Sequence, residues 1–222
     1  RPMILRAAIL KNASPDLARL VSGPLPTKSI AYNRTTPLVE YDPAVATAFA
    51  LAARKQLGGA LPELTLVCDP DPVSQEAAKQ CVEHWAARGV RVRLRSEPFS
   101  EGETPAWDLC YRTLQMAEPA TDLWPLLTAE PRAKVESLQH LSQWLSRELI
   151  ALDQTVDSAS AILRLKQFQA HLAAETELIP LWEVDAHVVF RKNVRQFVPE
   201  PVHPYQESES WIIEPWYVAD PL

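Results

Sequence analysis

Polar and aromatic side chains that could contact a ligand are grouped at and after the end of one predicted strand. They are Tyr111, Arg112, Thr113, Gln115 and Trp124. A strand end that mixes such residues suits a cleft wall that orients a ligand. The guanidinium of Arg112 has the geometry to hold a carboxylate through paired hydrogen bonds. A structural alternative stays open, in which Tyr111 and Trp124 belong to the core and Arg112 is a surface charge.

Nucleophilic and metal chemistry find little support in the sequence. No serine lies in a G-x-S-x-G motif, the signature of one large hydrolase class. The histidines are scattered over separate predicted elements, and none has the spacing of a metal motif. Cys81 and His84 are three residues apart on one predicted helix, which fits a buried thiol beside a surface imidazole better than a metal site. We therefore expect no enzymatic activity, no metal and no cofactor.

Two charged clusters also have a functional and a structural interpretation. Asp69 and Asp71 follow a predicted strand, where α/β sheets often bind ligands, but Asp71 precedes a proline and fits a helix N-cap better. Arg91, Arg93 and Arg95 share one face of another strand. They could attract an anion, although the solvated face of an edge strand is the more common explanation.

Composition narrows the class of protein. The chain has 222 residues, a net charge of −6, 47% hydrophobic and 23% charged residues, which is typical of a globular domain. An acidic balance is a poor match to a phosphate backbone, so nucleic acid is not an expected partner of this segment. No apolar run is long enough to cross a bilayer. The chain starts without a leader peptide, so we expect that a leader was removed or that it begins inside a longer protein.

The clearest predicted structure is a strand–helix–strand unit with two parallel strands. Leu61–Cys68 is rich in strand-forming residues, a helix begins after Asp71, and Val90–Arg95 alternates strictly between apolar and charged residues. Such a crossover is right-handed in nearly all proteins. The inner stripe of the helix is predicted to be Val73, Ala77, Cys81 and Trp85. A third strand is predicted over Trp107–Gln115.

Further helices are predicted on both sides of this unit. Ser14 caps a short helix that ends near Gly23, and Ala44–Leu57 forms an alanine-rich helix after Asp42-Pro43. A short helical piece covers Thr121–Leu127. Later in the chain, leucine spacing predicts one long helix over Pro131–Leu152 and another over Ser160–Ala174.

The last part of the chain is predicted to contain short strands and a proline-rich tail. The strands are Leu178–Trp182, Ala186–Phe190 and Val194–Val198. Residues 199–222 have no clear period, and their prolines and large aromatics suggest an extended segment lying against another surface.

Five segments, taken in order, resemble the second half of the family 5 extracellular solute-binding proteins, the oligopeptide, dipeptide and nickel receptors of ABC importers. Each motif is short, and their order over nearly the whole chain carries the resemblance. The segments are Ile4–Ile9, Tyr41-Asp42-Pro43-Ala44-Val45-Ala46, Leu64–Val92, Trp107-Asp108-Leu109, and Leu178-Ile179-Pro180-Leu181-Trp182 with Val188–Phe197.

The resemblance implies an α/β fold, a mixed sheet flanked by helices, as in the C-terminal lobe of a class II periplasmic binding protein. Residues 1–198 would form that lobe, and residues 199–222 would pack on a first lobe absent from this sequence. It further implies a small-molecule or peptide ligand held between closing lobes, a membrane permease as partner, and a periplasmic or cell-surface location.

One departure from the family pattern affects the ligand. The family usually has an aspartate in a "W-x-A-D-Y-x-D-P" segment that can grip a peptide amine, but Met116 or Ala117 occupies that position here. Glu118 could substitute for it. Two alternatives therefore stay open: a cytoplasmic effector-sensing domain of a transcription regulator, and a scaffold that no longer binds a ligand.

Overall fold

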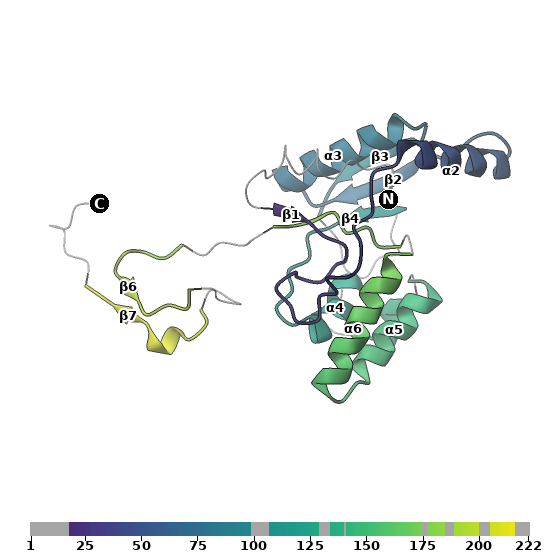
Figure 1. Cartoon of the computed structure of the whole chain (residues 1–222). Coiled ribbons are helices and arrows are strands. Elements are labelled where there is room, and N and C mark those ends of the chain that lie inside the picture. Colours follow the sequence, from purple (N-terminus) through teal and green to yellow (C-terminus); the bar gives the residue numbers. More distant parts are fainter. Residues whose placement is uncertain are drawn as a thin grey trace. The chain divides into compact units, whose positions relative to one another are not determined.

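A computed structural model describes residues 18–98, 107–128, 134–139, 141–174, 177–184, 189–199 and 205–215. The chain divides into two compact units, Arg1–Val184 and Asp185–Leu222. Helices, parallel strands and antiparallel strands all occur, so the predicted α/β class is confirmed (Figure 1). The parallel and antiparallel pairs form separate small sheets rather than one mixed sheet.

The predicted strand–helix–strand unit is present and forms the centre of the first unit. Strand β2 (Leu64–Cys68) leads into helix α3 (Pro72–Ala86), which leads into strand β3 (Val92–Ser96), and the two strands are parallel. Strand β4 (Leu109–Tyr111) pairs with β2 on its other side, also in parallel, giving the order β3-β2-β4.

Local capping explains the bounds of α3. A carboxylate oxygen of Asp71 accepts hydrogen bonds from the main-chain nitrogens of Val73 and Ser74 at 3.0 and 2.9 Å, which confirms the predicted N-cap. Gly89 ends the helical region at a φ of +77°, a conformation that costs glycine little. The predicted inner stripe is wrong at Val73, which is 47% exposed; the buried residues of α3 are Ser74, Ala77, Ala78 and Cys81.

Helix α2 (Pro43–Gln56) begins as predicted, with Asp42 accepting from the nitrogens of Ala44 and Val45. Only a thin alanine stripe of this helix, Ala46 and Ala50, is buried. The helix therefore owes its stability chiefly to its cap and its alanine-rich composition rather than to burial.

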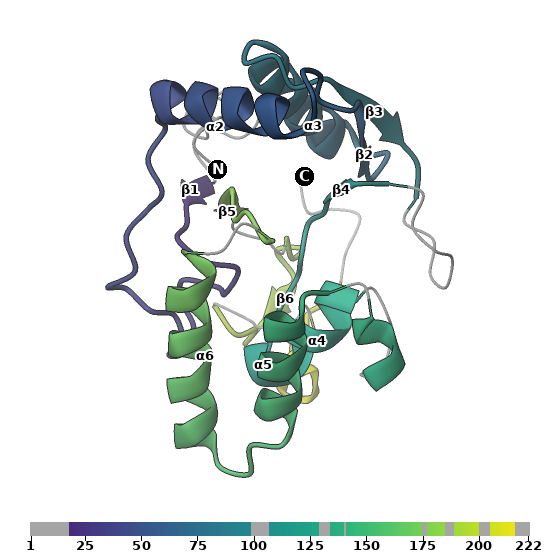
Figure 2. The same ribbon diagram turned by 90° about the vertical axis from the view of Figure 1, so that its right-hand side faces the viewer.

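Three helices form the second core of the first unit, below the sheet in Figures 1 and 2: α4 (Pro119–Thr128), α5 (Gln143–Asp153) and α6 (Ser158–Leu172). Their buried residues come together in one hydrophobic cluster, which includes Leu123, Leu149, Leu165, Phe168 and Leu172. This confirms the apolar face predicted for the later helix.

The single long helix predicted over Pro131–Leu152 is wrong. A short 3-10 turn, η1 (Val135–Leu138), precedes α5, and Ser142 caps the new helix by accepting from the nitrogen of Leu145 at 3.1 Å. The leucines still face one core because Leu138 and Leu145 are both buried in the helical cluster. Apolar spacing thus indicated the buried face correctly but concealed the break.

The helix predicted from Ser14 to Gly23 is also wrong over the described residues. Ala18–Leu20 forms strand β1, which pairs antiparallel with strand β5 (Trp182–Val184). β5 begins at Trp182, the last residue of the strand predicted over Leu178–Trp182, so that strand starts four residues later than predicted. The N-cap predicted at Ser14 lies outside the described residues.

A buried polar network fixes the loop between β1 and α2 on helix α6. The side chain of Gln169, 0% exposed, donates to Ser22 Oγ at 3.0 Å and to the carbonyl oxygen of Asn33 at 3.1 Å, and it accepts from Asn33 N at 2.9 Å. Ser22 Oγ also bonds the hydroxyl of Tyr32 at 3.0 Å. Gly23 is needed here because a Cβ at this position would lie 2.3 Å from Gln169 Cγ.

The second unit contains a two-stranded antiparallel ribbon, β6 (Val194–Arg195) and β7 (Ile212–Ile213), with a 3-10 turn, η2 (Ser208–Ser210), between them. The strand predicted over Val194–Val198 is therefore shorter, and Gln196 follows it with a φ of +59°. Of the strand predicted over Ala186–Phe190, residues 186–188 lie outside the described residues. Within the described parts of the chain, no helix is both long and apolar enough to span a membrane.

Candidate functional site

The carboxyl ends of the three parallel strands meet at one edge of the sheet. Cys68, the last residue of β2, is in register with Ser96 at the end of β3 and with Tyr111 at the end of β4. This is the edge at which open α/β sheets bind ligands. The predicted site residues begin here and follow the chain away from the sheet.

Tyr111 anchors this edge to the sheet core. Its ring packs with Ala77 and Cys81 of α3 and lies 6.4 Å from the ring of Trp182 between centroids, tilted by 49°. Burial raises the pKa of the Tyr111 phenol well above its ordinary value, so the hydroxyl stays protonated at physiological pH. Tyr111 can donate a hydrogen bond here but cannot act as a base.

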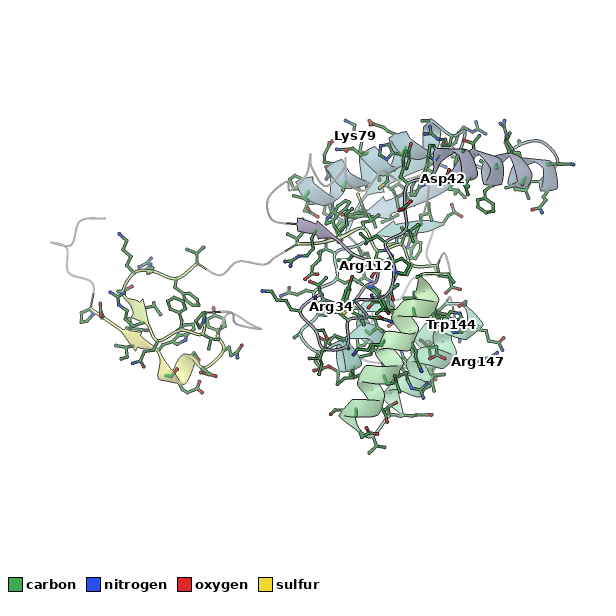
Figure 3. The ribbon with its side chains drawn as sticks, viewed as in Figure 1. Arg34, Asp42, Lys79, Arg112, Trp144 and Arg147 are labelled. Atoms are coloured by element: carbon green, nitrogen blue, oxygen red, sulfur yellow. The ribbon has the colours of Figure 1, made fainter. Side chains whose placement is uncertain are left out.

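Arg112 is placed between the sheet and the helices, in the middle of the first unit (Figure 3). It is half-buried, and its Nη1 donates to the carbonyl oxygen of Leu126, in the last turn of α4, at 2.7 Å. A cation at a helix C-terminus interacts favourably with the helix dipole and with carbonyls that have no partner in the helix. The structure thus shows Arg112 holding a helix end, a role that the sequence did not indicate.

The connection from β4 to α4, residues 112–118, leaves the sheet at Tyr111 because its partner strand β2 ends at the opposite residue, Cys68. Figure 2 shows it as a stretched link between the sheet and the helices. The third strand predicted over Trp107–Gln115 is therefore limited to Leu109–Tyr111.

Side chains alternate along this connection. Thr113 and Gln115 are exposed, while Leu114 and Met116 are half-buried and Met116 packs against the helical cluster. Among the hydrogen bonds of the described residues, none engages the main chain between Thr113 and Met116. The result is an accessible length of backbone with free donors and acceptors, flanked by two polar side chains.

Trp124, the last predicted site residue, lies in the helical core and is 7% exposed. Its Nε1 has no hydrogen-bond partner within the described residues. The structure does not expose Trp124 beside Thr113 and Gln115, so any contact with a ligand would have to be made from within the core.

The start of α4 is fixed by an acid that the sequence analysis missed. Asp122 Oδ2 accepts from the main-chain nitrogens of Ala117 and Glu118, both at 2.8 Å, which holds the end of the connection against the helix. Glu118 itself accepts from Ala120 N at 3.3 Å through Oε1 and is exposed. The available signal in the sequence was an aspartate, Asp122, in the first turn of a helix that begins with a proline, Pro119.

A shallow cavity of about 270 Å³ lies beside the same sheet edge, against α3. Gln75 closes one side, because its Nε2 donates to Ser96 Oγ at 2.9 Å and to the carbonyl oxygen of Pro70 at 2.8 Å. Lys79 contributes a positive charge (Figure 3). The lining residues are Pro72, Gln75, Glu76, Lys79, Leu94 and Ser96.

The three cysteines are free thiols, and none is activated. Burial raises the pKa of Cys81 to about 12 and that of Cys110 to about 11, and it also raises the pKa of Cys68. Thiolate is the nucleophilic form, so these values oppose cysteine chemistry at neutral pH. Within the described residues, no three His, Cys, Asp or Glu side chains are grouped to hold a metal ion.

Among the remaining charged candidates, Asp71, Arg93 and Arg95 have the structural roles that the sequence favoured. Asp71 caps α3, and hydrogen bonds from Ser74 lower its pKa. β3 is the edge strand of its sheet, and Arg93 pairs with Glu63 at 3.2 Å while Arg95 pairs with Glu97 at 2.8 Å.

No sequence-family profile matches the chain, and no curated protein sequence matches it. Solved structures match its fold. The oligopeptide-binding protein AppA of Bacillus subtilis, in complex with a nonapeptide, matches with a TM-score of 0.70 at 14% identity. NikZ of Campylobacter jejuni, in complex with Ni(L-His), gives 0.71 at 16%, and the periplasmic binding protein MelB of Agrobacterium fabrum C58, in complex with stachyose, gives 0.60 at 17%.

These matches take in most of this chain but only part of the other proteins. AppA is matched over 96% of this chain and 46% of its own length, NikZ over 95% and 46%, and MelB over 82% and 32%. The chain thus spans about half the length of the first two. At these identities the likeness is one of fold, and it confirms the predicted architecture: a lobe of the periplasmic binding protein type.

Proposed function

We propose that this chain is the C-terminal lobe of a two-lobed solute-binding protein that delivers its ligand to an ABC importer and performs no catalysis. The observation that carries the proposal is the accessible backbone between Thr113 and Met116, at the carboxyl edge of the parallel strands. The fold shared with solute-binding proteins of about twice this length supports it.

The proposed ligand is peptide-like and lies along the connection between β4 and α4. Unpaired main-chain donors and acceptors suit an extended chain, which pairs through its own backbone while neighbouring side chains select among sequences. Thr113 and Gln115 would contribute that selection, and Tyr111 would form the wall at one end. Arg112 and Trp124 would act from behind this surface, because one holds α4 and the other is buried.

A free amine is not required of this ligand. Met116 and Ala117 offer no carboxylate, and Glu118, although exposed, lies at the start of α4 and accepts a hydrogen bond from Ala120 N. The proposal therefore favours ligands held by their backbone over ligands held by a terminal charge.

The same proposal gives the second unit a partner, the first lobe. Val189, Tyr205 and Ile213 are 91%, 72% and 69% exposed, and this unit has only 38 residues. So short a segment cannot bury enough apolar surface by itself. We propose that it packs on the first lobe, with residues 199–222 making part of the contact, in a protein located in the periplasm or on the cell surface.

The test is ligand-induced stabilisation of the two-lobed protein, because a ligand that binds only the folded form must raise its unfolding temperature. The panel contains a nonapeptide, a nickel–histidine chelate and stachyose. Binding of the nonapeptide supports the proposal, and stabilisation by stachyose alone contradicts the peptide-like ligand.

Two variants locate the binding surface. Gln115→Pro removes a main-chain donor at an exposed position, and Gln115→Ala removes only the side chain. If backbone pairing holds the peptide, Gln115→Pro weakens binding by about ten-fold or more, and Gln115→Ala weakens it less. Equal affinity for both variants and the unchanged protein would exclude this segment as the site.

A further inference from the structure

The β4–α4 connection joins the sheet to the helices of the first unit, and another link between them runs through β5. Trp182 of β5 packs against Tyr111 and α3. The next residue, Glu183, accepts a hydrogen bond through Oε2 from the main-chain nitrogen of Thr27 at 3.0 Å. Because successive side chains of a strand point to opposite faces, β5 contacts the sheet core on one side and the β1–α2 loop on the other.

The loop that Glu183 holds is itself fixed to the helices. Gln169 of α6 bonds both Ser22 and Asn33, on either side of Thr27. Thr27 occupies the second position of a turn closed by the hydrogen bond from Ser29 N to the carbonyl oxygen of Pro26 at 3.0 Å. A continuous series of contacts therefore runs from α6 through the loop, Glu183 and Trp182 to Tyr111.

We propose that Glu183 is a positioning residue for the solute-binding segment, residues 112–116. It sets the place of Trp182, and through it of Tyr111, where that segment leaves the sheet. The far end of the segment is fixed independently on α4, because Asp122 accepts hydrogen bonds from the main-chain nitrogens of Ala117 and Glu118. Glu183 thereby determines how far apart the two ends of the segment lie. Its significance for ligand binding rests on the proposed function.

A plain alternative is that Glu183 only balances charge on the ribbon surface, since Arg19 lies directly opposite in the β1–β5 register. The two roles differ in what they require of the side chain. An acceptor for Thr27 N can be neutral, whereas a charge partner cannot. Glu183→Gln keeps an acceptor oxygen and loses the charge, and Glu183→Ala loses both.

The experiment uses the full chain without ligand and has two readings. The first is the exchange rate of the Thr27 amide hydrogen. The second is the ¹⁹F signal of Tyr111 in protein labelled with fluorotyrosine, identified among the five tyrosines with Tyr111→Phe. Thr27→Pro removes the main-chain donor of the bond to Glu183 and leaves the sequence of β5 unchanged. Proline is favoured at this turn position. Glu136→Ala, at an exposed glutamate of η1, is the matched control.

We expect Glu183→Ala to speed exchange at Thr27 by about ten-fold or more, as for loss of a hydrogen bond to a charged group. Both Glu183→Ala and Thr27→Pro should move the Tyr111 signal in the same direction, while Glu183→Gln and the control leave it in place. An unmoved Tyr111 signal in Glu183→Ala, or a Glu183→Gln variant that behaves like Glu183→Ala, overturns the proposal. Neither measurement needs a ligand. A failure of this proposal can therefore be distinguished from a failure of solute binding, which the ligand-stabilisation experiment tests.

Discussion

Replacing Gln169 with methionine should destabilise the first unit far more than the same change at an exposed neighbour. Methionine keeps most of the side-chain volume, so the cavity left behind is small. What is lost is the partner of Asn33 N and of the Asn33 carbonyl, while Ser22 keeps its bond to Tyr32. Each unsatisfied buried group costs roughly 1–3 kcal/mol, and since Asn33 is half-buried, we expect a total of about 2–4 kcal/mol.

Urea unfolding followed by circular dichroism measures this difference in free energy. The midpoint temperature of thermal unfolding should fall by roughly 2–4 °C for each kcal/mol lost. Gln167→Met, two residues earlier on α6 and exposed, is the control and should stay within about 0.5 kcal/mol of the unchanged chain. If the two variants unfold at the same urea concentration, the hydrogen bonds of Gln169 do not stabilise the fold.

A double-mutant cycle with Gly23 sharpens the test. Gly23→Ala places a Cβ 2.3 Å from Gln169 Cγ and 2.6 Å from its Cδ, so the glutamine must move and its hydrogen bonds must weaken. In a Gln169→Ala background these two atoms are absent, and the added methyl group meets less resistance. The two changes should therefore be non-additive by about 1 kcal/mol or more. Simple additivity would mean that Gly23 and Gln169 do not interact as the geometry indicates.

Two further predictions concern ionisable groups. Asp71→Ala should lower the free energy of unfolding by about 1 kcal/mol at neutral pH, because the α3 cap is lost. The pKa of Asp71 is lowered in the folded state. The contribution of the cap is therefore present above the unfolded pKa of about 4, and it disappears as the pH falls through the lower folded pKa. Urea titrations at pH 7 and 2.5 measure it, and an equal difference at both pH values would contradict the cap. With an alkylating reagent at pH 8, Cys110 should react before Cys81, and both should react at least about a hundred-fold more slowly than free cysteine. The reason is that burial raises their pKa values to about 11 and about 12. Mass spectrometry measures the order of labelling, and fast labelling of Cys81 would show that its site opens.

The parts of the fold that the sequence predicted correctly are those specified by local signals. Asp71 before a proline, Gly89 at the far end of α3 and the alternation of β3 each act over a few residues, and together they indicated the strand–helix–strand unit. Where tertiary pairing decided the outcome, the predictions failed. Ala18–Leu20 is a strand because β5 pairs with it from the far end of the unit. Likewise, the signal of Ser142 was hidden within a run of well-spaced leucines.

The candidate site shows the same division. The sequence located Thr113 and Gln115 at a strand end because strand composition is a local property. It could not reveal that the guanidinium of Arg112 reaches a backbone carbonyl, since any residue could supply that acceptor. The bond between Glu183 and Thr27 joins positions 156 residues apart and leaves no local pattern. Side-chain roles that depend on such distant partners needed the structure.

The ion pairs on β3 affect the tendency of the protein to aggregate at high concentration. An open strand border is a template on which another polypeptide can grow, the first step towards fibrils. A chain adding alongside Arg93 and Arg95 would have to strip water from two guanidinium–carboxylate pairs, those with Glu63 and Glu97. The charges along this strand therefore disfavour edge-to-edge pairing with further copies of the protein.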